Sequence, residues 1–189
     1  IINIGDPPKD CFDKEGYLKA TKDFPCTRLL HFQKQPKANK LNLTVYMRSN
    51  DLLWGASAVN IFNFTFMLEY FSQILGLEIG EYYHIANNFH YYEEFEDMVQ
   101  SISQVKNVTD SQFEYSKSFY NLSEFDEKIN LLKSEEDKLR QGNYADLIDF
   151  EDDFFNDWYK TFYAFNTHKE VTFSNPILNQ LFLKYMPYE

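Results

Sequence analysis

Apolar and polar residues alternate along two stretches near the start of the chain, on either side of a polar turn. The alternation is rough from Cys26 to Gln33 and regular from Leu41 to Met47. The residues between these stretches are polar and include Pro36 and Asn39. Because side chains on a β-strand point to opposite faces in turn, this pattern predicts two strands paired in a hairpin-like way.

The next periodic stretch, residues 60–75, is apolar on nearly every side and is followed by Gly76 and Leu77. A helix without a polar face is typical of a buried position, and a glycine followed by an apolar residue is a common helix end. We therefore expect a buried helix that stops at Gly76. A strand is expected over residues 81–85, directly before Asn87-Asn88-Phe89-His90-Tyr91-Tyr92.

The second half of the chain changes to helical periodicity. Amphipathic helices are expected over 93–105, 124–141, 144–165 and 176–185. Ser123 and Asn175 are the expected N-caps, with Pro176 at a first helical position and Gly142 as a stop. An acidic stretch is interpreted as a solvated helix face rather than a metal site. Its members are Asp146, Asp149, Glu151, Asp152 and Asp153.

Composition sets wider limits on what the chain does. Of 189 residues, 44% are hydrophobic and 19% aromatic, which is enough for a core. No long apolar run or signal peptide is seen, so we expect a cytoplasmic protein without a membrane partner. Two cysteines and four histidines lack the spacing of a disulfide framework or a zinc site, and no metal is expected. The chain starts at Ile1 inside an apolar run, so we expect that a segment precedes it.

The formal net charge of −11 disfavours a nucleic acid polymer as a partner. A mononucleotide is compatible with this charge, because one arginine can hold a phosphate locally. Arg48 offers a rigid fork of donors for a phosphate, and Ser49 adds a hydroxyl. Asn60 can pair with the edge of a base, and Cys26 is a candidate nucleophile. These residues predict a nucleotide site.

The order and spacing of these residues resemble the catalytic core of the thymidylate synthase family. The resemblance rests on Pro25-Cys26, Arg48-Ser49-Asn50-Asp51, Gly55, Asn60 and His90-Tyr91-Tyr92, and covers about residues 1–100. It implies an α+β fold, with a mixed sheet, a buried central helix and a helical C-terminal extension. The domains expected are a catalytic core over 1–100 and a helical extension over 101–189, packed on that core.

The resemblance also implies an activity, the reductive methylation of dUMP in a homodimer. In this family the cysteine attacks the sixth carbon of the pyrimidine, and methylenetetrahydrofolate, a co-substrate, supplies the one-carbon unit and a hydride. The residues implied as catalytic are Cys26, Arg48 and Asn60. Those implied for the pyrimidine deoxynucleoside monophosphate are Arg48, Ser49, Asn50, Asp51, Asn60, His90, Tyr91 and Tyr92. Those implied for the reduced folate are Asp51, Trp54 and Gly55, the glycine by letting the backbone approach the ligand.

Several alternatives stay open at this stage. The same chemistry with capture of water would make a dUMP or dCMP hydroxymethylase, although an asparagine at position 60 favours uracil. A catalytically silent binding subunit is a further alternative. Asp51 can be an N-cap or Asx-turn residue, and Asn60 a helix N-cap. Trp54 can line a pterin pocket or belong to the core, and His31 and His84 are interpreted as structural.

Overall fold

The computed structural model describes residues 1–21, 24–106, 113–144 and 146–185. It divides into two compact units, Ile1–Lys106 and Asn107–Glu189, where the sequence predicted a boundary after residue 100. Each unit is described by itself. No helix within the described ranges is both long enough and apolar enough to cross a membrane.

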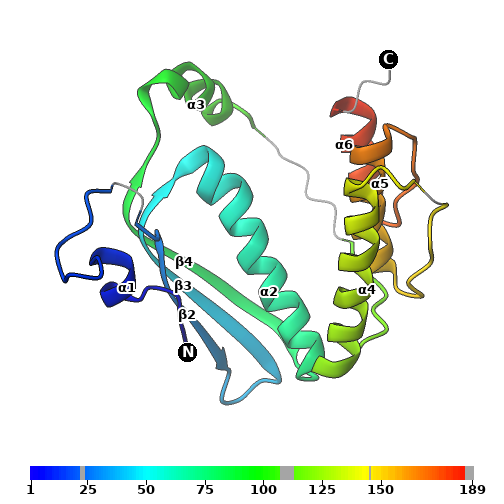
Figure 1. Ribbon diagram of the computed structural model, residues 1–189, viewed down its shortest axis with the longest axis horizontal. Helices are drawn as coiled ribbons and strands as arrows, with labels where there is room; N and C mark the ends of the chain where they lie inside the picture. The colour runs from blue at the N-terminus through cyan, green and yellow to red at the C-terminus, as the bar shows by residue number, and fades with distance from the viewer. Residues whose placement is uncertain (22–23, 107–112, 145, 186–189) are drawn as a thin grey trace. The chain divides into compact units, whose positions relative to one another are not determined.

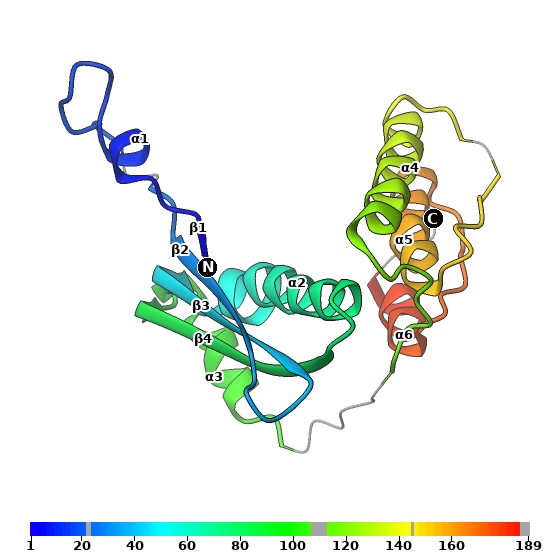
Figure 2. The ribbon, with the colours of Figure 1, turned by 90° about the horizontal axis from the view of Figure 1, so that it is seen from below.

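The first unit is built on a four-stranded mixed sheet in the order β1-β2-β3-β4 (Figures 1 and 2). Its strands are β1 (Ile2–Asn3), β2 (Thr27–Lys34), β3 (Lys40–Asp51) and β4 (Glu78–His90). β2 and β3 are antiparallel, which confirms the predicted strand pair, and β3 and β4 are parallel. β4 is much longer than the predicted strand over 81–85, because it pairs with β3 from Lys40 to Asp51. The unit is thus of the expected α+β class.

Helix α2 (Asn60–Ile74) lies along one face of this sheet (Figures 1 and 2). The core between them contains Leu30, Leu41, Leu43, Val45, Met47, Phe64 and Leu68. The helix ends as predicted, since Gly76 has a φ of 63° and the N–H of Leu77 donates to the carbonyl of Ser72 over 2.9 Å. The prediction of a buried helix is correct only for the face of α2 that packs on the sheet, which carries the buried Phe64 and Leu68. On the outer face, Phe62 is 63% exposed and stacks on Phe66.

A π-helix, η1 (Leu52–Val59), joins β3 to α2. The sequence did not predict it, because a π-helix has no simple periodicity of apolar residues. Such elements are rare and occur frequently at functional sites. Beyond β4, a short 3-10 turn, η2 (Glu93–Phe95), leads into α3 (Glu96–Ser103), where one helix over 93–105 was expected. Near the start of the chain, α1 (Pro7–Cys11) interrupts the loop that leads to Cys26.

The helices described in the second unit are α4 (Leu122–Arg140), α5 (Asp153–Thr167) and α6 (Pro176–Tyr185). Of these, α4 and α5 lie side by side in both views (Figures 1 and 2). The core of this unit is aromatic. Phe155 is fully buried, with ring centroids of Phe119, Phe125 and Phe154 at 5.8, 5.7 and 5.5 Å. These edge-to-face and tilted contacts are favoured geometries for aromatic pairs.

Two predicted helix starts in this unit are wrong, and side-chain caps explain both. Helix α4 is capped by Asn121 instead of Ser123, since Asn121 Oδ1 accepts from the N–H of Glu124 over 3.0 Å. Helix α5 begins at Asp153 instead of residue 144, since Asp152 Oδ1 accepts from the N–H of Phe155 over 3.0 Å. For α5, the predicted start was too early because the apolar pattern continues through the loop before the helix.

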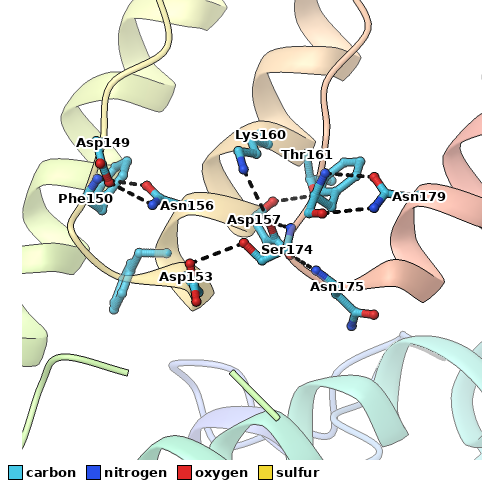
Figure 3. A network of polar contacts seen from close by, with 12 residues as sticks. Asp149, Phe150, Asp153, Asn156, Asp157, Lys160, Thr161, Ser174, Asn175 and Asn179 are labelled. Atoms are coloured by element: carbon cyan, nitrogen blue, oxygen red, sulfur yellow. Dashed lines mark hydrogen bonds and ion pairs between the residues drawn. The ribbon is translucent and has the colours of Figure 1, made fainter. Parts of the chain in front are cut away.

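The acidic stretch is not a solvated helix face. Residues 146–152 precede α5, and Asp152 is only 4% exposed because it caps that helix. On the next turn, Asp157 is 1% exposed and accepts from the N–H groups of Ser174 and Asn175 over 2.7 and 2.8 Å (Figure 3). This carboxylate ties the segment before α6 to α5. Acidic residues in this unit therefore stabilise helix starts and loops.

Candidate nucleotide site

A cavity of about 540 Å³ lies in the first unit, where the end of β3, the π-helix η1, the start of α2 and the end of β4 meet. Its size is typical of small-ligand sites. Its lining residues are Phe24, Cys26, Arg48, Ser49, Asn50, Asp51, Trp54, Gly55, Val59, Asn60, Asn88, His90 and Tyr92. Of the eleven residues predicted to bind or react with ligands, ten line this cavity, and Tyr91 does not.

Arg48 is bound to the loop that carries Cys26. Its backbone N–H donates to the carbonyl of Cys26 over 2.9 Å. Its guanidinium donates from Nε to the carbonyl of Pro25 over 3.2 Å and from Nη2 to the carbonyl of Phe24 over 2.6 Å. A guanidinium has five N–H groups, so these two bonds leave others for a ligand. The arginine thus fixes the exposed Cys26 beside the cavity.

Asp51 is the N-cap of η1, as one sequence interpretation allowed, and Oδ1 accepts from the N–H of Trp54 over 2.6 Å. The other oxygen, Oδ2, is buried and has no hydrogen-bond partner among the described residues. An unpaired buried acceptor is costly, and in a native structure it calls for an explanation. Asp51 therefore offers an unused acceptor at the cavity wall. Trp54 is not a core residue, because it is 67% exposed.

Asn60 does not cap α2, because its side chain is used elsewhere. Its Nδ2 donates to Asn50 Oδ1 over 2.8 Å, and the N-cap position of α2 is Val59. Gly55 lies directly against this pair. A Cβ added at Gly55 would stand 1.8 Å from Asn50 Oδ1 and 3.0 Å from Asn60 Nδ2. The absence of a side chain at Gly55 therefore makes room for the two amides, in addition to any role toward a ligand.

Behind Asn50 lies a histidine that the sequence suggested was merely structural. Asn50, which is 3% exposed, places its Nδ2 2.7 Å from His84 Nε2, and His84 Nδ1 is 2.7 Å from the Tyr82 hydroxyl. Burial lowers the pKa of His84 and raises the pKa of Tyr82 to about 12. Both groups are therefore neutral near pH 7.

The part of the cavity lining that comes from the end of β4 and the residues after it is polar and aromatic. Asn88 Nδ2 donates to Ser49 Oγ over 3.2 Å and lies 3.5 Å from His90 Nδ1. The rings of His90 and Tyr92 meet edge to face, with centroids 5.4 Å apart. β4 ends at His90, so Tyr92 lies just beyond the strand. These groups give the cavity several donors and acceptors in addition to Arg48.

Sequence reasoning missed three lining residues, Phe24, Val59 and Asn88. Asn88 had a usable signal, because it lies two residues before His90 on a strand and so shares its face. Phe24 and Val59 had no such signal. Phe24 lies in the loop before Cys26, and Val59 is the last residue of the π-helix η1.

The cavity thus combines a thiol, a guanidinium, a carboxylate, two hydroxyls, three side-chain amides and an imidazole around a space of ligand size. Such a set suits a small anionic ligand with a polar ring, which defines a candidate nucleotide site. A sequence profile of the thymidylate synthase family matches residues 14–141. That is more than half of the chain, so the chain belongs to the thymidylate synthase family.

Individual relatives match shorter stretches. A deoxyuridylate hydroxymethyltransferase from Bacillus phage SP01 is 46% identical over 72 residues, which are 38% of this chain and 18% of the relative. A thymidylate synthase from Symbiobacterium thermophilum is 36% identical over 69 residues, which are 36% of this chain and 24% of the relative. The chain spans less than two thirds of the length of these relatives.

Among solved structures, the thermostable thymidylate synthase A from Bacillus subtilis aligns with 27% identity and a TM-score of 0.39. The alignment covers 49% of this chain and 31% of that one.

Proposed function

We propose that the cavity binds dUMP and that the protein transfers a one-carbon unit to its base. The observation that carries the proposal is the meeting of Cys26, Arg48 and Asn60 at one cavity, from three different elements of the chain. A thiol, a phosphate-binding guanidinium and an amide suited to a base edge are the groups that such a reaction requires. The family membership supports the same chemistry.

In this proposal, different residues of the cavity lining bind the phosphate, the base and the sugar of the nucleotide. Arg48 and Ser49 bind the phosphate, the arginine through the N–H groups that Phe24 and Pro25 do not use. Asn60 binds the base, with Asn50 behind it. His90 and Tyr92 bind the sugar hydroxyl, and the adjacent Tyr91 contributes from outside the lining residues.

Cys26 acts as the nucleophile. After loss of its proton, the sulfur forms a bond to the sixth carbon of the pyrimidine. The electron pair of the double bond between the fifth and sixth carbons moves toward the fifth carbon and the neighbouring carbonyl. The fifth carbon then becomes nucleophilic. Asn60 would hold the base so that the sixth carbon faces Cys26.

The residues assigned to the folate also fit such a ligand. Asp51 Oδ2 is a buried acceptor without a partner in the described residues, and the pterin ring of a reduced folate carries N–H donors. Trp54, at 67% exposed, presents a large apolar surface beside this acceptor, and Gly55 completes the wall. When bound, methylenetetrahydrofolate supplies the one-carbon unit.

Two products are compatible with these residues. Reductive methylation gives thymidylate and is the activity that the sequence resemblance favours. Hydroxymethylation is a second candidate, and a specific observation favours it: the phage deoxyuridylate hydroxymethyltransferase matches at 46% identity, against 36% for the bacterial thymidylate synthase. A silent binding subunit is the least favoured candidate, since Cys26 and Arg48 both line the cavity.

The test is an assay with dUMP and methylenetetrahydrofolate, followed by chromatography of the nucleotide product against authentic thymidylate and 5-hydroxymethyldeoxyuridylate. Cys26→Ser should abolish turnover while dUMP binding stays within about tenfold, or about 1.4 kcal/mol. Cys11→Ser is the matched control, because Cys11 lies in α1 and outside the cavity lining. Unchanged turnover in Cys26→Ser would remove Cys26 as the nucleophile.

We further propose the assembly that the resemblance implies, a cytoplasmic homodimer. Size-exclusion chromatography with light scattering measures the mass in solution and so tests the dimer. A monomer mass at concentrations that support turnover would contradict it.

A further inference from the structure

A continuous chain of hydrogen bonds runs from the cavity wall into the sheet. It joins Asn60 Nδ2 to Asn50 Oδ1 over 2.8 Å, Asn50 Nδ2 to His84 Nε2 over 2.7 Å, and His84 Nδ1 to the Tyr82 hydroxyl over 2.7 Å. Only Asn60 and Asn50 line the cavity, so His84 and Tyr82 lie behind the lining. These hydrogen bonds thus connect the amide of Asn60, which lines the cavity, to groups outside the cavity wall.

The structure places the Asn50 amide with Nδ2 toward His84 and Oδ1 toward Asn60, and this orientation gives the row of hydrogen bonds one direction. An amide nitrogen can only donate, so Asn50 Nδ2 requires His84 Nε2 to be an unprotonated acceptor. The single proton of a neutral His84 then lies on Nδ1, toward Tyr82. The lowered pKa of His84, caused by burial, is consistent with that neutral form. With its nitrogen fixed on His84, Asn50 must present its oxygen to Asn60.

This direction fixes the Asn60 amide. Its nitrogen faces Asn50 Oδ1 over 2.8 Å and Met47 Sδ over 4.0 Å, and its Oδ1 remains for a ligand donor. Because a thioether sulfur is a weak acceptor, a ligand carbonyl can replace Met47 as the partner of the second N–H. If the amide turned over, its oxygen would face the Asn50 oxygen, and two acceptors would meet without a hydrogen between them. Asn50 is 3% exposed, so water cannot easily relieve that contact. The packing of Gly55 against both amides further limits their movement.

We propose that Asn50 and His84 are positioning residues that hold the Asn60 amide in one orientation and thereby make the site select uracil over cytosine. This inference rests on the proposed function, in which Asn60 binds the base. Uracil presents an N–H donor beside a carbonyl acceptor, whereas cytosine presents an acceptor beside an amino donor. An amide held in one orientation suits the first pattern, and the same amide turned over suits the second.

The variants His84→Phe and Asn50→Leu test this row of hydrogen bonds, because each variant removes one of its members. In both, the Asn60 amide loses its fixed orientation, and the ratio of dUMP to dCMP affinity should fall by about tenfold in calorimetric titrations. The matched control is His31→Phe, the same substitution on strand β2, which is separated from β4 by β3. His31 lies outside the cavity lining, so the ratio should stay unchanged.

A conservative variant separates positioning from mere packing. In Asn50→Asp, a carboxylate oxygen still accepts from Asn60, and His84 can shift its proton to Nε2 and donate to the other oxygen. The affinity ratio should therefore stay within about threefold of the unsubstituted chain. Nitrogen NMR of the imidazole should report a proton on His84 Nδ1 in the unsubstituted chain and on Nε2 in Asn50→Asp.

The outcomes distinguish the two proposals. If the unsubstituted chain prefers dUMP and both His84→Phe and Asn50→Leu keep that preference, the positioning role is overturned and the proposed function stands. A His84 proton on Nε2 in the unsubstituted chain would also overturn it. If the unsubstituted chain binds neither nucleotide, the proposed function fails, and base selection fails with it.

Discussion

Arg48 and Cys26 are joined through their backbones, because the N–H of Arg48 donates to the carbonyl oxygen of Cys26 over 2.9 Å. The Arg48 side chain then reaches the carbonyls of Phe24 and Pro25. Arg48 thus holds the loop of the candidate nucleophile through both its backbone and its side chain. A substitution of the side chain removes the bonds to Phe24 and Pro25 and leaves the backbone bond to Cys26 in place. A variant at position 48 therefore tests the guanidinium without releasing Cys26 from β3.

Arg48→Ala should weaken the binding of dUMP by about 2 kcal/mol or more, because a charged hydrogen-bonding partner of the phosphate is lost. Deoxyuridine has no phosphate, so its weaker binding should barely change. Calorimetric titration of both ligands measures the difference. Arg28→Ala removes an arginine on β2 that does not line the cavity, and serves as the control. Equal dUMP affinity in Arg48→Ala and the unsubstituted chain would contradict the phosphate assignment.

Asp51→Asn should separate folding from folate binding. The asparagine keeps one oxygen that can accept from the N–H of Trp54, so the cap of η1 and the thermal stability should be retained. The second oxygen becomes an NH₂ group, which cannot accept from a pterin N–H. Binding of a reduced folate in the presence of dUMP should weaken by about 1–3 kcal/mol, measured by fluorescence titration. Unaltered folate affinity would remove Asp51 from the folate site.

His84 should make stability fall in mild acid. Burial lowers its pKa in the folded chain below the ordinary value of 6.5, so the unfolded chain binds a proton first as the pH falls. The stabilising contribution is therefore complete above about pH 6.5 and is lost as the pH falls toward the lowered value. Urea unfolding at pH 5 to 8 measures this slope. The slope should be shallower in His84→Phe than in His31→Phe, and equal slopes would be the contrary result.

Phe155→Ala should destabilise the second unit by about 3–5 kcal/mol, since it removes a fully buried ring from an aromatic core. Phe165→Ala on the same helix is the matched control, because Phe165 is 70% exposed. Its stability should change by less than about 0.5 kcal/mol. Chemical denaturation followed by circular dichroism gives both values, and similar losses in the two variants would contradict the assignment of the core.

The sequence determined local features whose physics is local. Alternation over Leu41–Met47 defined a strand, and the turn before it placed Arg48 beside Cys26, because a hairpin-like pair brings its neighbouring residues together. Gly76 ended α2 for a local reason too, since the left-handed backbone there favours glycine. The motif residues from Cys26 to Tyr92 could likewise be recognised, because their order and spacing are properties of the sequence.

Only the tertiary structure decided how distant residues meet. The side chains of His84 and Asn50 meet across β3 and β4, although the register of these strands pairs His84 with Val45, and nothing in the pattern around either residue indicates that partner. Asp157 is buried, and its carboxylate accepts from the N–H groups of Ser174 and Asn175, which lie 17 and 18 residues further along the chain. Hydrogen bonds between residues far apart depend on geometry that local periodicity does not encode, and the arrangement behind Asn60 is of this kind.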